Sequence, residues 1–214
     1  MKIDINQYQI LQQAYDFFNK ELFNLELPEV VFTLDYRKSS SAGFFHFEKI
    51  ITELKGMPNQ KCKEKRISII SLNPDNFDRD NIKILATLAH EMCHVAEAYL
   101  FKPPTSSYHT KKWSEKMESI GLTPTHDGTP TGKKTGHRMT HIIQPGGLFE
   151  QIAKTFIKAN KNIFLFIGVK EIKTPKAACR NKTKYTCSCG EKIYSQPGLN
   201  ATCNKCNTTF KSYE

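Results

Sequence analysis

Residues 81–96 read NIKILATLAHEMCHVA, and the fold predicted from the sequence is built around this segment. Its apolar residues recur at the spacing of one helical face, as at Leu85, Leu88, Met92 and Val95. We therefore expect a helix that begins near Asn81, capped by Asp78 or Asp80, and continues to the Pro103-Pro104 break.

Within this helix, His90-Glu91-Met92-Cys93-His94 has the spacing of a metal-binding motif. Positions 90 and 94 lie about 40° apart on a helix, so both imidazoles can reach one tetrahedral zinc ion. Glu91 is rotated by about 100° from His90 and is placed to reach a metal-bound water. Because zinc acidifies that water and a carboxylate can take its proton, the motif indicates hydrolytic chemistry.

A catalytic zinc needs a third protein ligand, and no histidine follows at the spacing found in metzincins. The downstream candidates are His109, His126, His137 and His141, with the carboxylates Glu97, Glu115, Glu118 and Glu150. His109 is the best candidate because the Pro-Pro loop before it can turn the chain back. Trp113 follows one turn later, and we expect it to pack in the core and fix the direction of the imidazole.

Other patterns outline the rest of the chain. We expect helices at 8–22 and 148–159, a further helix from His109 to near Gly121, and strands at 30–34, 43–47, 67–72 and 163–169. We expect connections or loops at 55–66, 121–140 and 170–184. Residues 128–135 faintly resemble a phosphate-binding loop, but the glycine spacing is one residue short, and we reject this interpretation.

Four of the seven cysteines fall in a short C-terminal segment. Cys187-x-Cys189 and Cys203-x-x-Cys206, thirteen residues apart, resemble a zinc ribbon in which the metal supplies the folding energy. The first pair is one residue tighter than usual, which makes Cys179 a possible substitute ligand. Tyr194 and Phe210 are candidates to pack against the metal knuckles. Cys62 and Cys93 are expected to be buried thiols.

The positive charge is concentrated towards the C-terminus. Residues 151–214 hold 12 Lys and Arg against 3 Asp and Glu, whereas the remaining 19 and 18 nearly cancel. This asymmetry predicts a polyanionic partner, and sequence-independent or single-stranded DNA is the expected one. The candidate contact residues are Lys182, Lys184, Tyr185, Lys192, Tyr194, Lys205 and Lys211.

The two histidine motifs resemble those of the SprT-like metallopeptidases, which include the eukaryotic protease Spartan. These motifs are residues 90–94 and Tyr108-His109-Thr110-Lys111-Lys112-Trp113, and the cysteine segment beginning Tyr185-Thr186-Cys187 also fits the family. The second motif departs at Thr110, where the family usually has glycine. Residues 121–149 are similar to phage- and plasmid-borne members.

The resemblance implies that His90, His94 and His109 bind the catalytic zinc and that Glu91 is the catalytic acid and base. It also implies cleavage of proteins attached to or bound on DNA, stimulated by DNA. His137 and His141 are spaced like a second metal pair, but we interpret them as loop residues near the cleft. One of them, or Tyr108, is a candidate hydrogen-bond donor to the oxyanion.

We therefore predict an α+β protein: a zincin-like minidomain with its HExxH helix on a small sheet, followed by a zinc ribbon. The predicted parts are a peptidase domain at 1–150, a helix, strand and basic linker at 151–184, and the ribbon at 185–214. Two zinc ions are expected, one catalytic and one structural, with protein substrates and no membrane partner. The first residues mix charged and apolar side chains and do not have the pattern of a signal peptide, so we expect a cytoplasmic location, near the nucleoid or in a host cell. The alternative is a DNA-binding adaptor whose three-histidine zinc site is structural.

Overall fold

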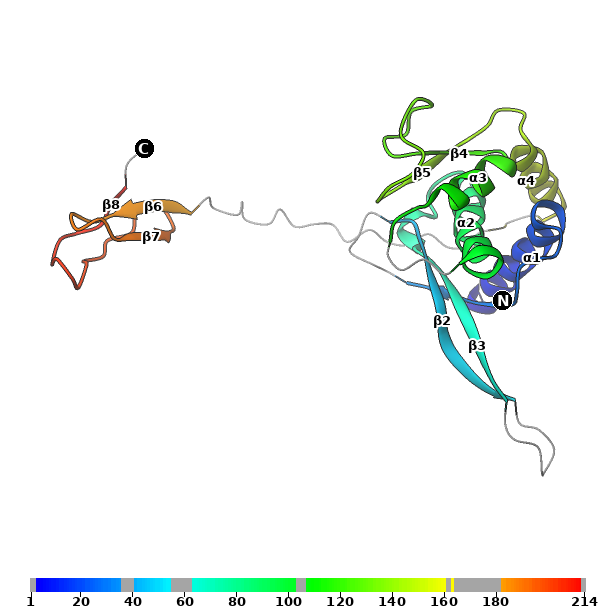
Figure 1. Cartoon of the computed structure of the whole chain (residues 1–214), viewed down its shortest axis with the longest axis horizontal. Coiled ribbons are helices and arrows are strands. Elements are labelled where there is room, and N and C mark those ends of the chain that lie inside the picture. The colour runs from blue at the N-terminus through cyan, green and yellow to red at the C-terminus, as the bar shows by residue number, and fades with distance from the viewer. Residues whose placement is uncertain are drawn as a thin grey trace. The chain divides into compact units, whose positions relative to one another are not determined.

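The computed structural model describes residues 3–35, 41–54, 63–102, 107–160, 163 and 182–212 (Figure 1). The chain divides into two compact units, Met1–Val169 and Lys170–Glu214. The first contains α1 (Ile3–Phe23), β1 (Val30–Leu34), β2 (Gly43–Leu54), β3 (Lys63–Leu72), α2 (Asn81–Ala96), α3 (Lys111–Ser119), β4 (Leu122–Thr125), β5 (Thr140–Ile143) and α4 (Leu148–Ala159). The mixed α+β class is as predicted. The proposed boundaries at 150 and 184 stay predictions.

A three-stranded sheet in the order β1-β3-β2 supports the helices. β1 is parallel to β3, and β2 is antiparallel to β3 with a register shift between His46 and Ile50. At this irregularity Glu48 has a φ of 43°, and its N–H donates to Ser68 Oγ at 2.9 Å. The strands run to Leu54 and restart at Lys63, so the predicted connection at 55–66 is shorter than expected. Figure 1 shows β2 and β3 as a long hairpin.

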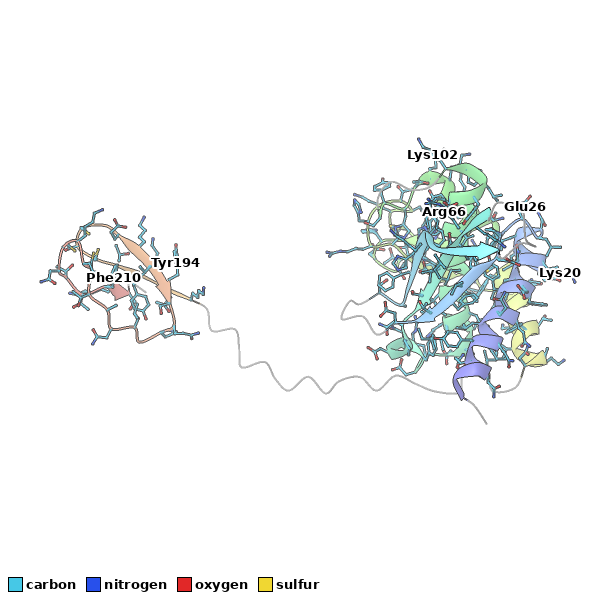
Figure 2. The ribbon with its side chains drawn as sticks, turned by 90° about the horizontal axis from the view of Figure 1, so that it is seen from below. Lys20, Glu26, Arg66, Lys102, Tyr194 and Phe210 are labelled. Atoms are coloured by element: carbon cyan, nitrogen blue, oxygen red, sulfur yellow. The ribbon has the colours of Figure 1, made fainter. Side chains whose placement is uncertain are left out.

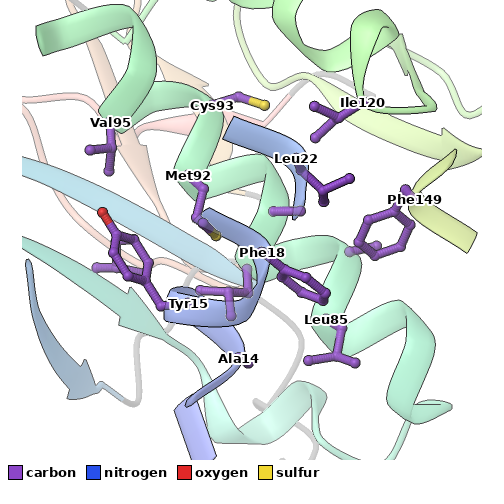
Figure 3. Packing of buried hydrophobic residues seen from close by; sticks show 14 of the residues in the cluster. Ala14, Tyr15, Phe18, Leu22, Leu85, Met92, Cys93, Val95, Ile120 and Phe149 are labelled. Atoms are coloured by element: carbon purple, nitrogen blue, oxygen red, sulfur yellow. The ribbon is translucent and has the colours of Figure 1, made fainter. Parts of the chain in front are cut away.

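The hydrophobic core lies between the sheet and the helices α1, α2 and α4 (Figure 3). Tyr15 and Phe18 of α1, Met92 of α2 and Phe149 of α4 are at most 1% exposed. The ring centroids of Phe18 and Phe149 are 5.7 Å apart, so α1 and α4 meet directly. Burying a large apolar side chain contributes roughly 1.5–3 kcal/mol, and this packing fixes α2 in the centre of the unit.

The central helix α2 is buried along nearly its whole length, from Ile84 to Ala96. It begins as predicted after Asp80, whose side chain makes no capping hydrogen bond. At its other end the chain continues as a π-helical turn, Glu97–Phe101. Such π-turns are found preferentially at functional sites because they redirect side chains from the regular helical face.

The region 121–140 was predicted to be a loop, and this prediction is wrong at both ends. β4 and β5 form an antiparallel pair in which Pro124 lies opposite His141. Four-residue strands without clear alternation give no local signal, because they are stabilised by their cross-strand partners. Gly121, with a φ of 91°, ends α3 as predicted, and a Cβ there would approach the backbone nitrogens of Leu148 and Phe149 to 3.0 Å.

The second unit is a small sheet in the order β7-β6-β8. Its strands are β6 (Thr183–Thr186), β7 (Lys192–Ser195) and β8 (Lys211–Ser212). The strand predicted at 163–169 lies outside the described residues except for Ile163, which is 1% exposed. The linker predicted at 170–184 also lies largely outside them. Across the described part of the chain, no helix combines the length and apolar character of a membrane span.

Candidate metal centres and catalytic cleft

The helix α2 presents His90, Glu91 and His94 to a cleft of about 1310 Å³. His90 is 8% exposed and Glu91 is 4% exposed, so both lie at the bottom of the cleft. His90 and His94 project from one face of the helix, and Glu91 projects about 100° further round, so that all three side chains line the cleft. The ring centroids of His90 and His94 are 5.3 Å apart.

His109 reaches the same place from a separate segment, just before α3. The backbone N–H of His109 donates to the carbonyl oxygen of Gly136 at 2.8 Å, and the backbone N–H of Gly136 donates back to the carbonyl oxygen of His109 at 3.1 Å. This bridge fixes the backbone that carries the imidazole. The candidate ligand atoms of His90, His94 and His109 all lie within 4.8 Å of one another, close enough to converge on one metal ion.

Each of the three imidazoles has a protein partner at its Nδ1 atom. For His90 it is Nδ1 of His141 at 3.2 Å, and for His109 it is the carbonyl oxygen of Gly136 at 3.1 Å. For His94 it is Oε2 of Glu97 at 3.7 Å. Because these partners orient the rings from behind, the Nε2 atoms are left to face a metal. The donor set therefore fits zinc, which binds neutral imidazole nitrogens.

The protonation of the histidines also suits a metal. Burial lowers the pKa of His90 well below its usual value, and neighbouring His141, His94 and His109 add to this effect. Burial likewise lowers the pKa of His109 to about 4 and that of His141 to about 4. The rings of His90, His109 and His141 are consequently neutral near pH 7. Neutral imidazole is the form in which His90 and His109 can bind a metal without first releasing a proton.

Glu97 is a site residue that the sequence reasoning considered only as an alternative ligand. It is 3% exposed, and the Thr110 hydroxyl donates a hydrogen bond to its Oε1. Within the described residues, its Oε2 has no hydrogen-bond partner and instead faces Nδ1 of His94. Thr110 is the position that departs from the family pattern, and here it links Glu97 to the N-terminus of α3. The spacing of His94 and Glu97, three residues apart, was the available signal.

Trp113 forms the floor beneath the three imidazoles, as its predicted role requires. It is 0% exposed, and its ring centroid lies 4.4 Å from that of His109, 4.9 Å from that of His90 and 5.3 Å from that of His94. On the other side, Phe45 of β2 stacks on His94 with an interplanar angle of 7°. The ring of His94 is thus confined between Phe45 and Trp113, which limits its rotation.

The carboxyl group of Glu91 lies against the start of β2. A Cβ placed on Gly43 would lie 2.7 Å from Glu91 Oε1 and 3.0 Å from Thr87 Cγ2, so only glycine allows this close approach. Burial raises the pKa of Glu91 to about 8 from a usual value of 4.5. A carboxyl group of raised pKa beside a metal site is typical of a proton-transfer residue.

The remaining predicted cleft residues come from the segments before α3 and around β5. Tyr108, His137 and His141 all line the cleft. The ring centroids of Tyr108 and His137 are 5.3 Å apart, and Ser107 Oγ lies 3.4 Å from Nδ1 of His137. His141 was predicted to be a loop residue, but it belongs to β5 and contacts His90. An oxyanion role for any of the three stays a prediction.

The second candidate metal centre is in the C-terminal unit. One sulfur atom from each of Cys187, Cys189, Cys203 and Cys206 lies within 4.8 Å of the others. Hydrogen bonds from Thr208 and then Ser188 lower the pKa of Cys206 to about 5, which favours the metal-binding thiolate. Cys179 and Cys62 lie outside the described residues, whereas Cys93 is a buried thiol, 0% exposed, as predicted.

The predicted DNA-contact residues of this unit do not all face solvent. Tyr185 is 4% exposed, and its hydroxyl donates to the carbonyl oxygen of Gln196 and accepts from the N–H of Leu199. Its ring is therefore structural, which corrects the expectation that it stacks on a base. Tyr194 is 63% exposed, so most of its ring faces solvent, whereas it was expected to pack against the metal knuckles (Figure 2).

Comparison with known proteins assigns a family to this mixed α+β chain with its histidine and cysteine clusters. The model of the SprT-like family matches residues 11–135, more than half of the chain, and the chain belongs to that family. It is also 43% identical over 44 residues to an uncharacterized protein in the mucB 3' region of Salmonella typhimurium. That match covers 21% of this chain and 58% of the other protein, and no solved structure matches the chain. The family indicates a metallopeptidase-like role, for which the chain has candidate metal ligands.

Proposed function

We propose that this chain is a zinc-dependent endopeptidase with a zincin-like minidomain and a C-terminal zinc ribbon. The observation that carries the proposal is the convergence of His90, His94 and His109 beside the buried carboxyl group of Glu91, at the bottom of an open cleft. A purely structural zinc site closes its fourth position with protein and has no use for a neighbouring acid.

The proposed mechanism assigns a separate task to each side chain. His90, His94 and His109 would hold the zinc, which when bound would supply a Lewis acid and an acidified water. Glu91 would accept a proton from the water as the water oxygen bonds to the carbonyl carbon, and would deliver that proton to the amine nitrogen as the peptide C–N bond breaks. The pKa of Glu91, raised by burial to about 8 in the metal-free protein, falls when a cation binds nearby, so the carboxylate becomes available as a base.

The decisive comparison is Glu91→Gln against wild type, with Glu115→Gln as the matched control. Glu115 is an exposed glutamate on α3 that pairs with Lys111 and Lys112. We expect Glu91→Gln to keep both zinc ions and the folding transition while cleavage of an unstructured protein falls by about 10²–10⁴-fold. Undiminished cleavage by Glu91→Gln rejects the assignment, and zinc-loaded wild type that cuts nothing favours the adaptor alternative.

We further propose that the sheet of the second unit binds nucleic acid, which would bring the peptidase to proteins on DNA. Lys184 lies opposite Tyr194, and Thr186 lies opposite Lys192 on one side and Lys211 on the other. Directly paired residues share a face of a sheet, as do residues two apart on one strand. Three exposed lysines therefore surround the exposed ring of Tyr194 on one face, the arrangement that single-stranded DNA recognition uses.

This nucleic-acid proposal is tested with Tyr194→Ala in a fluorescence anisotropy titration with single-stranded DNA. Stacking of a base on an aromatic ring contributes about 1–3 kcal/mol, so affinity should fall about 5- to 150-fold. Tyr8→Ala removes a tyrosine that is 40% exposed on α1 and serves as the control. Binding that is insensitive to both Tyr194→Ala and salt concentration rejects the proposed face.

A further inference from the structure

Arg79 lines the catalytic cleft just before α2 begins. Its Nε donates to the carbonyl oxygen of Asn76 at 2.8 Å, and its Nη2 donates to Thr87 Oγ1 at 3.2 Å. Thr87 lies one helical turn before Glu91, on the same face of α2. The guanidinium is therefore held in a fixed orientation in the lining of the cleft, where it is bonded to a residue one helical turn from Glu91.

The guanidinium of Arg79 donates its hydrogen bonds to two neutral oxygens, and no ion pair to it occurs within the part of the chain that the structure describes. Burial, opposed only by the charge of Asp78, lowers its pKa. The positive charge of Arg79 also adds to the effect of burial in lowering the pKa of His141, another cleft residue. A half-buried cation without a paired carboxylate is costly unless a ligand supplies the anion.

The side chains that line the cleft carry more positive than negative charge, as Arg79 itself does. Its described lining contains the cations Arg79, Lys83 and Arg138, whereas its carboxylate is Glu91. Lys83 lies 3.4 Å from Asp80 and is therefore partly compensated. Arg79 differs from the other two cations because it is half-buried and already oriented by hydrogen bonds. A planar guanidinium held in this way matches the geometry of a carboxylate.

We propose that Arg79 forms a substrate subsite that binds an acidic side chain, Asp or Glu, of the peptide in the cleft. This inference rests on the proposed peptidase function and names the substrate class of that site. Four residues of α-helix span about 6 Å, and an extended peptide advances about 3.3 Å per residue. The acidic side chain should consequently lie about two residues from the cleaved bond.

The test uses two peptides that differ by Glu or Gln at one position, moved through positions one to three on each side of the cleavage site. Charge-assisted hydrogen bonds justify an expected preference of about 10- to 100-fold in kcat/KM for the glutamate peptide at one position. Arg79→Gln should reduce the preference to about one, and Arg79→Lys should retain part of it. Arg66→Gln, an exposed arginine of β3 outside the cleft, is the matched control and should change nothing (Figure 2).

Binding of the same labelled peptides to the zinc-loaded protein, followed by anisotropy, decides the subsite independently of cleavage. If wild type prefers the glutamate peptide but cleaves neither, the subsite stands and the peptidase proposal fails. If wild type cleaves both equally, or Arg79→Gln keeps the preference, the subsite is rejected and the peptidase stands. Loss of the preference in Lys83→Gln rather than Arg79→Gln also overturns the inference. The inference is also overturned if a single-stranded oligonucleotide displaces the peptide from wild type but not from Arg79→Gln, because the anion that Arg79 binds is then a phosphate.

Discussion

Replacing Gly43 by alanine tests whether the position of the Glu91 carboxyl group limits the proposed reaction. The added Cβ would lie 2.7 Å from Glu91 Oε1 and 3.0 Å from both Glu91 Cγ and Thr87 Cγ2. Favourable contacts between heavy atoms begin near 3.5 Å, so the side chain or the strand must move by about 0.5–0.8 Å. Misplacement of a catalytic group by about 1 Å can cost about 10²-fold, and we expect kcat to fall about 10- to 100-fold.

The accompanying change in stability should be modest. Overpacking costs about 1–3 kcal/mol, whereas replacing glycine by alanine restricts the unfolded chain and returns about 0.4–1 kcal/mol. Gly147→Ala is the matched control, because the added Cβ would lie 2.9 Å from Gln144 Cβ, and neither residue lines the cleft. We expect the two variants to lose similar thermal stability, while activity falls in Gly43→Ala alone.

The measurement is steady-state cleavage of a labelled unstructured protein, with zinc content and thermal unfolding recorded on the same samples. Gly43→Ala placed on the Glu91→Gln background should cause almost no further loss, since both changes act through one carboxyl group. Unchanged kcat in Gly43→Ala, or full additivity of the two changes, would refute the reasoning. An equal loss of kcat in Gly147→Ala would also do so, because overpacking anywhere in the unit would then explain the effect.

Three further outcomes are expected. Glu97→Gln should weaken zinc binding about 10- to 100-fold, measured by competition with a chromogenic chelator. Glu118→Gln, at a half-buried glutamate of α3 that pairs with Lys134, should not weaken it. In the metal-free protein, the raised pKa of Glu91 gives a contribution to stability that is complete below about pH 4.5 and lost as the pH rises to about 8. The melting temperature of wild type should thus fall relative to Glu91→Gln over that range in EDTA, and a constant difference contradicts it. Cys203→Ser should reduce bound zinc from about two ions to about one per chain and unfold the second unit, with peptide cleavage retained. Loss of cleavage along with that zinc would show that the two units depend on each other.

Much of the candidate site could be predicted from the spacing of residues within single segments of the sequence. The histidines of α2 and the central position of that helix follow from helical periodicity, which acts over a few residues. Trp113 was expected in the core because burial of a large aromatic ring is strongly favourable, and its side chain is fully buried. The boundaries of α4, Leu148–Ala159, were also predicted from its apolar pattern.

Other features depended on contacts between distant segments. β5 is too short and too irregular to be predicted, and its pairing with β4 is what carries His141 to Nδ1 of His90 across 51 residues. Tyr185 and Tyr194 look equivalent in the sequence, yet one is buried and the other exposed. The pairing of β6 with β7 and β8 decides which face of the sheet is covered, and no local pattern in a four-residue strand specifies it.

The chemistry of the metal-binding groups follows from the amino-acid sequence alone, because ligand type and helical spacing are local properties of the chain. The surroundings of those groups follow from the folded structure: Glu97 behind His94, Gly43 against Glu91, and Arg79 in the cleft lining. Such neighbours come from elements packed against one another, and packing depends on side-chain shapes across the whole core rather than on any single stretch of residues.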